Sequence, residues 1–124
     1  MLREKIVAQS ACRMIAICDS TKAVERLPLG PLPVEVLPFA RTFVAHGIEV
    51  LGAQAILRAM PDGSIYRTDQ GNCVFDCHGP ADLPIEAFAA KLQSIPGVLS
   101  HGLFLDEIDA LYIARNNRVE CVER

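Results

Sequence analysis

The chain has 124 residues, of which 51% are hydrophobic and 22% are charged, and its formal net charge is −3. This length and apolar content predict one globular domain that buries roughly two thirds of its unfolded surface. The charge balance provides no basic surface for a nucleic-acid backbone, and the apolar segment 14–18 is too short for a signal peptide or a membrane span. We therefore expect a soluble cytoplasmic protein without nucleic-acid or membrane partners.

The first thirty residues predict a helix, a strand and a connector. Helical periodicity runs over residues 2–12. Its apolar face consists of Leu2, Ile6, Val7 and Ala11. Residues 13–20, RMIAICDS, contain almost no polar alternation, which is typical of a central strand buried on both faces of a parallel sheet. Residues 26–33, RLPLGPLP, predict an extended connector and a subdomain boundary, because proline and glycine interrupt regular structure.

Residues 31–105 predict one regular β-α-β-β-α-β unit, which is the ferredoxin-like arrangement. The expected segments are PVEVLP (33–38), FARTFVAHGIEVLG (39–52), AILRAM (55–60), CVFDCHG (73–79), LPIEAFAAKLQSI (83–95) and VLSHGLFL (98–105). Two further strands are expected at 110–115 and 118–123. Asn116 and Asn117 between them tolerate the left-handed backbone of a tight hairpin.

The ferredoxin-like unit can close its own core. The first helix, the first strand and the last hairpin are not part of this unit. These three elements have the pattern of a second sheet whose other strands are absent from the chain. We therefore expect an α/β (α+β) protein with two parts. Residues 1–30 and 106–124 form part of a doubly wound α/β domain, and residues 31–105 form the ferredoxin-like domain.

The five cysteines, at positions 12, 18, 73, 77 and 121, include no Cys-x-x-Cys pair. The nearest approach to a metal cluster is Cys73, Cys77 and His78. On a strand, the two thiols share one face and His78 points to the other, which divides the candidate ligands. We therefore expect small buried hydrophobic residues in a reducing compartment, with no bound metal.

Seven motifs occur in order along nearly the whole chain. They are REKIVA (3–8), DSTK (19–22), PLPVEVLPFA (31–40), TDQGN (68–72), DCH (76–78), IPGV (95–98) and HGLF (101–104). This series resembles the C-terminal portion of type A ribose-5-phosphate isomerase. The resemblance implies a large α/β domain that carries the active site and a small ferredoxin-like domain. It also implies that the chain starts at the helix after the family's glycine-rich active-site loops, which lie upstream.

The resemblance implies an aldose-ketose isomerase that acts on a sugar phosphate through an enediolate, without a cofactor. A homo-oligomer is expected for a separate reason, the unpaired edges of the first strand and the last hairpin. The resemblance assigns the catalytic base to Glu4 and substrate binding to Lys22. The residues alone favour a different interpretation of Glu4, a first-turn glutamate stabilised by the helix dipole by about 0.3–1 kcal/mol, and only the family match favours the base. For Lys22 the residues alone favour a solvated turn lysine, although it follows a strand end where open α/β sheets bind ligands.

The remaining polar candidates carry no assigned role. His78 and His101 are possible acid-base residues beside Asp76, but a histidine in such a strand is more often a hydrogen-bonded structural residue. Glu35 lies between two valines on a strand. The alternative function is a non-catalytic ferredoxin-like module for binding or oligomerisation. Either way, residues 13–18 and 110–122 are expected to support self-association through unpaired strand edges.

Overall fold

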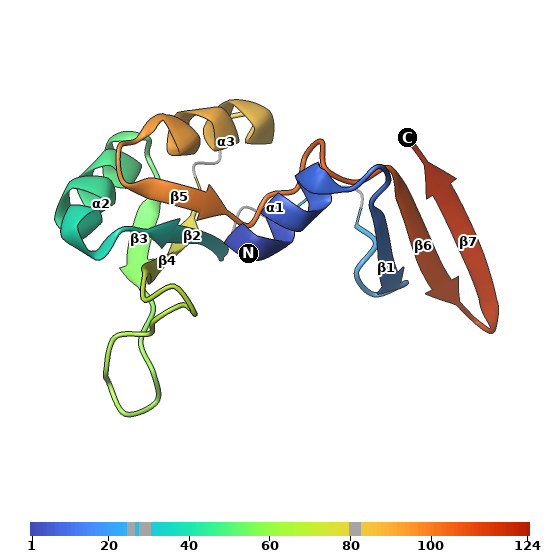
Figure 1. Ribbon diagram of the computed structural model, residues 1–124, viewed down its shortest axis with the longest axis horizontal. Coiled ribbons are helices and arrows are strands. Elements are labelled where there is room, and N and C mark those ends of the chain that lie inside the picture. Colours follow the sequence, from blue (N-terminus) through green and yellow to red (C-terminus); the bar gives the residue numbers. More distant parts are fainter. Residues whose placement is uncertain (25–26, 28–30, 80–82) are drawn as a thin grey trace. The chain divides into compact units, whose positions relative to one another are not determined.

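The protein is described by a computed structural model, which covers residues 1–24, 27, 31–79 and 83–124. Half of the predicted connector, residues 26 and 28–30, lies outside this description. The chain divides into two compact units (Figure 1). The first unit comprises Met1–Leu2 and Leu29–Leu103, and the second comprises Arg3–Pro28 and Phe104–Arg124. None of the described helices is sufficiently long and hydrophobic to cross a lipid bilayer.

The first unit contains a four-stranded antiparallel sheet in the order β3-β4-β2-β5, and its two helices cover one face (Figure 1). Its elements are β2 (Leu32–Val36), the 3-10 helix η1 (Pro38–Ala40), α2 (Arg41–Val50), β3 (Gln54–Leu57), β4 (Cys73–His78), α3 (Ile85–Ser94) and β5 (Val98–His101). This order and pairing confirm the predicted ferredoxin-like unit.

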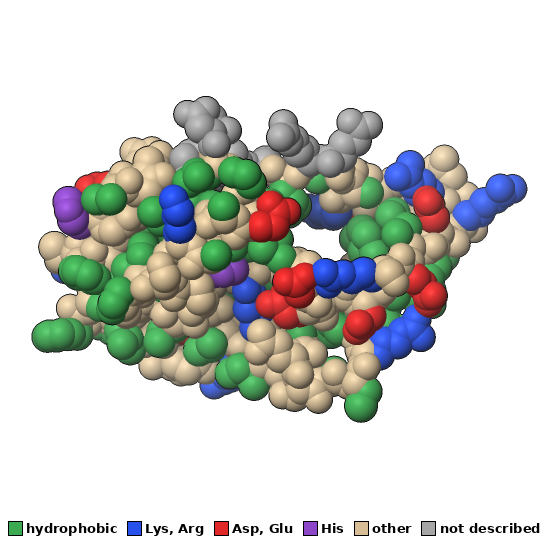
Figure 2. Space-filling model, turned by 90° about the horizontal axis from the view of Figure 1, so that it is seen from above, with side chains coloured by type: hydrophobic (Ala, Val, Ile, Leu, Met, Phe, Trp, Pro, Cys, Tyr) green, Lys and Arg blue, Asp and Glu red, His purple; other side chains and the backbone are tan. Residues whose placement is uncertain are grey.

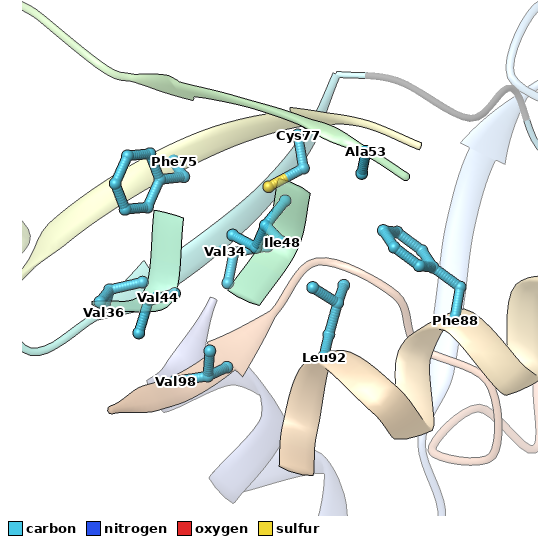
Figure 3. Packing of buried hydrophobic residues seen from close by; sticks show 10 residues of the cluster. All are labelled: Val34, Val36, Val44, Ile48, Ala53, Phe75, Cys77, Phe88, Leu92 and Val98. Atoms are coloured by element: carbon cyan, nitrogen blue, oxygen red, sulfur yellow. The ribbon is translucent and has the colours of Figure 1, made fainter. Parts of the chain in front are cut away.

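The core of the first unit lies between the sheet and its two helices (Figure 3). Alternate residues of β2 and β4 point to this face because successive strand side chains point to opposite sides. Phe88 and Leu92, one helical turn apart on α3, are at most 1% exposed. The sheet side contributes Val34, Val36, Phe75, Cys77 and Val98, and the helix α2 side contributes Val44 and Ile48.

The opposite face of this sheet buries a carboxylate. Glu35 of β2 is 2% exposed, and its Oε1 atom accepts hydrogen bonds from Thr68 Oγ1 and Asn72 Nδ2, each at 2.9 Å. The TDQGN segment is also closed on itself, because the Thr68 N–H donates to the Asn72 carbonyl at 3.0 Å. The motif therefore forms a tight turn that is bound to the sheet through its hydrogen bonds to Glu35.

The second unit contains a three-stranded sheet in the order β1-β6-β7. Its elements are α1 (Leu2–Ser10), β1 (Ile15–Asp19), β6 (Ala110–Arg115) and β7 (Arg118–Glu123). Strand β1 pairs parallel with β6, and β6 pairs antiparallel with β7. Asn116 and Asn117 have φ angles of 42° and 62°, which is the left-handed conformation predicted for this hairpin.

The prediction that the first strand is buried on both faces is wrong for the described chain. Strand β1 alternates between exposed and half-buried residues, and Ile17 is 82% exposed. In the described part of the chain β6 is the only strand paired with β1. The continuous apolar run therefore indicates a strand that requires more cover than these residues provide.

The predicted apolar face of the first helix is also wrong. Ile6 and Val7 are 55% and 63% exposed, and the helix ends at Ser10. The less exposed positions are Leu2, Lys5 and Ala8, which are spaced three residues apart and lie on one side of the helix. The covered face thus contains a lysine in place of the expected branched side chains.

Candidate functional site

Glu4 lies in the first turn of α1 with an exposed side chain. A hydrogen bond from the N-terminal ammonium group, followed by one from its own backbone N–H, lowers the pKa of Glu4 below the ordinary value. The charge of Arg3 adds a smaller effect in the same direction. The carboxylate is therefore ionised at neutral pH, which is the form that can accept a proton.

Lys22 lies in the turn that follows β1. Its backbone N–H donates to the Asp19 carbonyl at 3.1 Å, which closes the turn. Asp19 stabilises the same turn through its side chain, because Oδ1 accepts from the Thr21 backbone N–H at 2.8 Å and from the Thr21 hydroxyl. These bonds lower the pKa of Asp19. The hydrogen bond from the Thr21 hydroxyl has the largest effect, and the charge of Lys22 has a smaller one.

The position of this turn is characteristic of a ligand site in an α/β sheet. Because β1 and β6 are parallel, their carboxyl ends lie at the same edge of the sheet. The Ser20 N–H donates to the Ala114 carbonyl at 3.0 Å and extends the pairing into the turn. Lys22 is exposed and forms no salt bridge within the part of the chain that the structure describes. An ammonium at such an edge is free to bind an anionic ligand.

The second unit also contains polar residues that sequence reasoning missed. Lys5 forms a sheltered salt bridge with Glu107, 3.4 Å from Nζ to Oε1. Asp109 accepts a hydrogen bond from the Met14 N–H through Oδ2 at 2.6 Å. A helical pattern of apolar residues cannot reveal either contact. The Asp-Ser-Thr signature of a side-chain turn, in contrast, could have identified the role of Asp19.

His78 and His101, the two histidine candidates, belong to the first unit and differ in their surroundings. His78 is exposed at the end of β4, whereas His101 is only 6% exposed at the end of β5. Asp76 is bound by Arg58, whose Nε and Nη2 atoms lie 3.0 and 2.5 Å from its oxygens. Among the described residues, no group of three or more His, Cys, Asp or Glu side chains could hold a metal ion.

The cysteines follow the prediction only in the first unit. Cys73 and Cys77 are buried in β4, as expected, and burial raises the pKa of Cys77 to about 12. Cys12 and Cys121 are exposed, and Cys18 is half-buried, so the expectation of burial is wrong for the second unit. All five thiols are free. The difference arises because β7, which carries Cys121, has no buried residue.

Comparisons with known proteins agree with this fold. The sequence model of ribose 5-phosphate isomerase A (phosphoriboisomerase A) matches residues 1–118. Ribose-5-phosphate isomerase A from Sphingopyxis alaskensis is 46% identical over all 124 residues, which cover 54% of that protein. The structure of ribose 5-phosphate isomerase A from Methanocaldococcus jannaschii has a TM-score of 0.89 at 29% identity, over 99% of this chain and 55% of that one.

A structure of D-ribose-5-phosphate isomerase in complex with phospho-erythronic acid has a TM-score of 0.85 at 31% identity, over 98% of this chain and 54% of that one. The chain thus spans about half the length of the relatives it matches. The match of the sequence model and the 46% identity extend across both units. The chain therefore belongs to the ribose 5-phosphate isomerase A family.

Proposed function

We propose that this chain supplies Glu4 and Lys22 to the active site of a ribose-5-phosphate isomerase. The reaction interconverts ribose 5-phosphate and ribulose 5-phosphate in the pentose phosphate pathway. The observation that carries the proposal is the exposed Lys22 at the carboxyl edge of the parallel pair β1–β6, in a chain that matches this family over residues 1–118.

In this proposal Glu4 is the base that moves the proton. Its carboxylate removes the proton from C2 of the open-chain aldose, which leaves an enediolate with negative charge on the oxygen at C1. The proton of the C2 hydroxyl then moves to the oxygen at C1, the protonated Glu4 delivers its proton to C1, and the electron pair on the C2 oxygen forms the carbonyl of the ketose. Lys22 binds the anionic substrate, and the hydrogen bonds of Asp19 hold the Lys22 turn in place. The reaction requires no cofactor.

The two residues are not a complete active site. Proton transfer through an enediolate requires donors directed at the developing oxyanion, and a single base and lysine without them lose several powers of ten in rate. We therefore expect no measurable isomerase activity from the 124-residue chain by itself. The remaining groups belong, in this proposal, to a segment equivalent to the part of the relatives that the chain does not match.

The same proposal assigns the domains and the assembly. Residues 1–30 and 106–124 are part of the catalytic α/β domain, and residues 31–105 are the small ferredoxin-like domain. Exposed apolar side chains on the second unit, Ile17 among them, support association with a second copy or with the rest of the catalytic domain. The protein is expected to be a cytoplasmic homo-oligomer.

A chimera tests the proposal directly. The 124 residues replace the matched part of the Sphingopyxis alaskensis enzyme, and conversion of ribose 5-phosphate is measured. Glu4→Gln should lower kcat by at least a thousandfold, because the amide cannot accept the proton. Lys22→Met should raise KM for the sugar phosphate. Lys91→Met, at an exposed position of α3, is the matched control and should change neither.

The alternative is a non-catalytic ferredoxin-like module, and the closed core of the first unit favours it. That function predicts a chimera whose activity, if any, does not depend on Glu4. Full activity of the Glu4→Gln chimera would therefore contradict the proposed role. Activity of the isolated 124-residue chain that Glu4→Gln abolishes would contradict only the expectation that the chain alone is incomplete.

A further inference from the structure

Helix α1 has an unusual covered face. Its one buried residue is Ala8, and the position one turn earlier on the same side is Lys5. The branched apolar residues Ile6 and Val7 face solvent, at 55% and 63% exposure. A methyl group buries little apolar area, so the hydrophobic effect provides only a weak constraint on how this helix is rotated about its axis.

The side chain of Lys5 provides the constraint instead. Its Nζ atom lies 3.4 Å from Glu107 Oε1, and the two side chains are only 13% and 11% exposed. The same ammonium lies 5.4 Å from the centre of the Phe104 ring, within the range of a cation–π contact. Both partners come from the segment between β5 and β6. The lysine is thus held by a carboxylate and by an aromatic face.

Glu107 is in the charged form that this contact requires. Burial opposes ionisation, but hydrogen bonds from the backbone N–H groups of Glu107 and Asp106 and the nearby Lys5 ammonium outweigh it, so the pKa of Glu107 is lowered. Removing one partner of a sheltered ion pair leaves the other charge without compensation. The contact therefore contributes more to the docking of α1 than an exposed surface pair would.

The segment between β5 and β6 also binds the chain just after the C-terminal end of α1. The Met14 N–H donates to Asp109 Oδ2 at 2.6 Å, and the Asp109 N–H donates to the Met14 carbonyl at 2.9 Å. Residues 104–109 therefore contact the chain both before and after the end of α1. Since neighbouring helix residues project about 100° apart, fixing Lys5 also fixes the direction of Glu4.

We propose that Lys5, held by Glu107 and Phe104, is a positioning residue that sets the direction of the Glu4 carboxylate. This inference rests on the proposed function, in which Glu4 is the base. Lys5 acts through the helix and does not touch the substrate. Its loss should affect the chemical step more than substrate binding, because a misplaced base lowers the rate without removing a binding contact.

Kinetics of the chimera described above test the inference. Lys5→Met, which keeps the stem and removes the charge, should lower kcat by roughly tenfold to a hundredfold and leave KM within about twofold. Glu107→Gln should have the same effect. Lys5→Arg should restore most of kcat, because the guanidinium keeps the charge. Lys91→Met is the matched control, since this lysine is exposed on α3 of the first unit, and it should leave kcat unchanged.

The outcomes separate the two proposals. If Glu4→Gln abolishes activity and Lys5→Met leaves kcat unchanged, the positioning role is overturned and the proposed function stands. If Glu4→Gln is fully active, the proposed function fails, and the role of Lys5 in catalysis fails with it. A loss in Lys5→Met that Lys5→Arg does not restore would indicate a purely steric effect and would also overturn the inference.

NMR spectroscopy of the 124-residue chain provides a measurement that needs no activity. The ε-methylene protons of Lys5 should be shifted upfield by the Phe104 ring, and Phe104→Leu should abolish this shift. In Lys5→Met the amides of α1 should exchange with solvent at least tenfold faster, while those of β4 stay unchanged. Unshifted Lys5 protons, or unchanged exchange in α1, would overturn the inference even if every chimera proved inactive.

Discussion

The two units of this chain are stabilised differently. The first unit closes an apolar core between one sheet and two helices, in which side chains such as Phe88 and Leu92 are almost fully buried. The second unit leaves every residue of β7 exposed and relies on strand pairing and salt bridges. Figure 2 shows acidic and basic side chains next to one another in the region of the second unit. A single chain thus combines an extensive apolar core with a second sheet in which only a few side chains, such as Ala110 and Ile113, are buried.

The largest expected difference between the units is in thiol reactivity. The pKa of Cys77 rises from 9.0 to about 12, which lowers its thiolate fraction at neutral pH about a thousandfold, and its burial also blocks the reagent. Cys121 is exposed. Brief alkylation at pH 7, followed by peptide mass spectrometry, should label Cys121 and leave Cys77 unmodified.

Two controls accompany this measurement. In urea, where burial is lost, Cys77 should be labelled as readily as Cys121. With rising pH the labelling of native Cys77 should continue to increase up to about pH 12, because the thiolate is the reactive form. Equal labelling of both thiols in the native protein at pH 7 would contradict the closed core of the first unit.

This contrast explains how much of the fold could be predicted from the sequence. Strands and helices of the first unit were predictable because their apolar residues recur with periods of two and 3.6. The structure buries the core-facing members of these patterns, such as Val44, Ile48 and Leu92, whereas Phe43 remains 59% exposed. Helix α1 failed this test. Its apolar residues Ile6 and Val7 face solvent and Lys5 faces inward, and no hydrophobic pattern predicts a helix that docks through a salt bridge.

Phe88→Ala should have the largest effect on stability. The ring is 1% exposed in the core of the first unit, so its removal should lower the free energy of unfolding by about 3–5 kcal/mol. Phe43→Ala is the matched control, because this ring on α2 is 59% exposed, and it should cost less than about 1 kcal/mol. Urea unfolding followed through the amides of β4 measures both.

The effect of Phe88→Ala on the unfolding of the second unit shows whether the two units unfold together. The two tyrosines lie in different units, Tyr66 in the first and Tyr112 in the second. Tyrosine fluorescence of single Tyr→Phe variants therefore reports each unit separately. If Phe88→Ala shifted the urea midpoint of both signals equally, the chain would unfold as one cooperative unit, and the distinction drawn between the units would not extend to their stability.

A smaller effect is expected at the opposite face of the first sheet. Asn72→Ala removes one of the two donors to Glu35 Oε1 and leaves a buried carboxylate oxygen less satisfied, at a cost of about 1–3 kcal/mol in the free energy of unfolding. The control is Gln93→Ala at an exposed position of α3. If both variants unfold at the same urea concentration, the Glu35 bonds contribute no net stability.

The candidate site could be predicted only in part. Lys22 stays a predicted substrate-binding residue, and the sequence argument for it is that a polar residue after a strand of a parallel sheet lies at the ligand-binding edge. Glu4 stays a predicted base that rests only on the family motif REKIVA, since a first-turn glutamate is common in any helix. Asp19 lies in the same motif as Lys22, so its turn-forming role could have been read from the sequence. Glu107 could not, because folding brings it to Lys5 from about a hundred residues further along the chain.

The smallest effect on stability and the most direct test of the open sheet come from Ile17→Lys. Ile17 is 82% exposed on β1, so the change should alter the free energy of unfolding by less than about 0.5 kcal/mol.

If exposed apolar residues of the second unit drive self-association, the charge added by Ile17→Lys should weaken this association, because an unpaired charge opposes burial in an interface. Sedimentation at tens of micromolar, with Val50→Lys on exposed α2 as the matched control, measures the change. A wild-type chain that sediments as a monomer would show that the exposed face of the second unit does not bind a second copy, and it would contradict the proposed self-association.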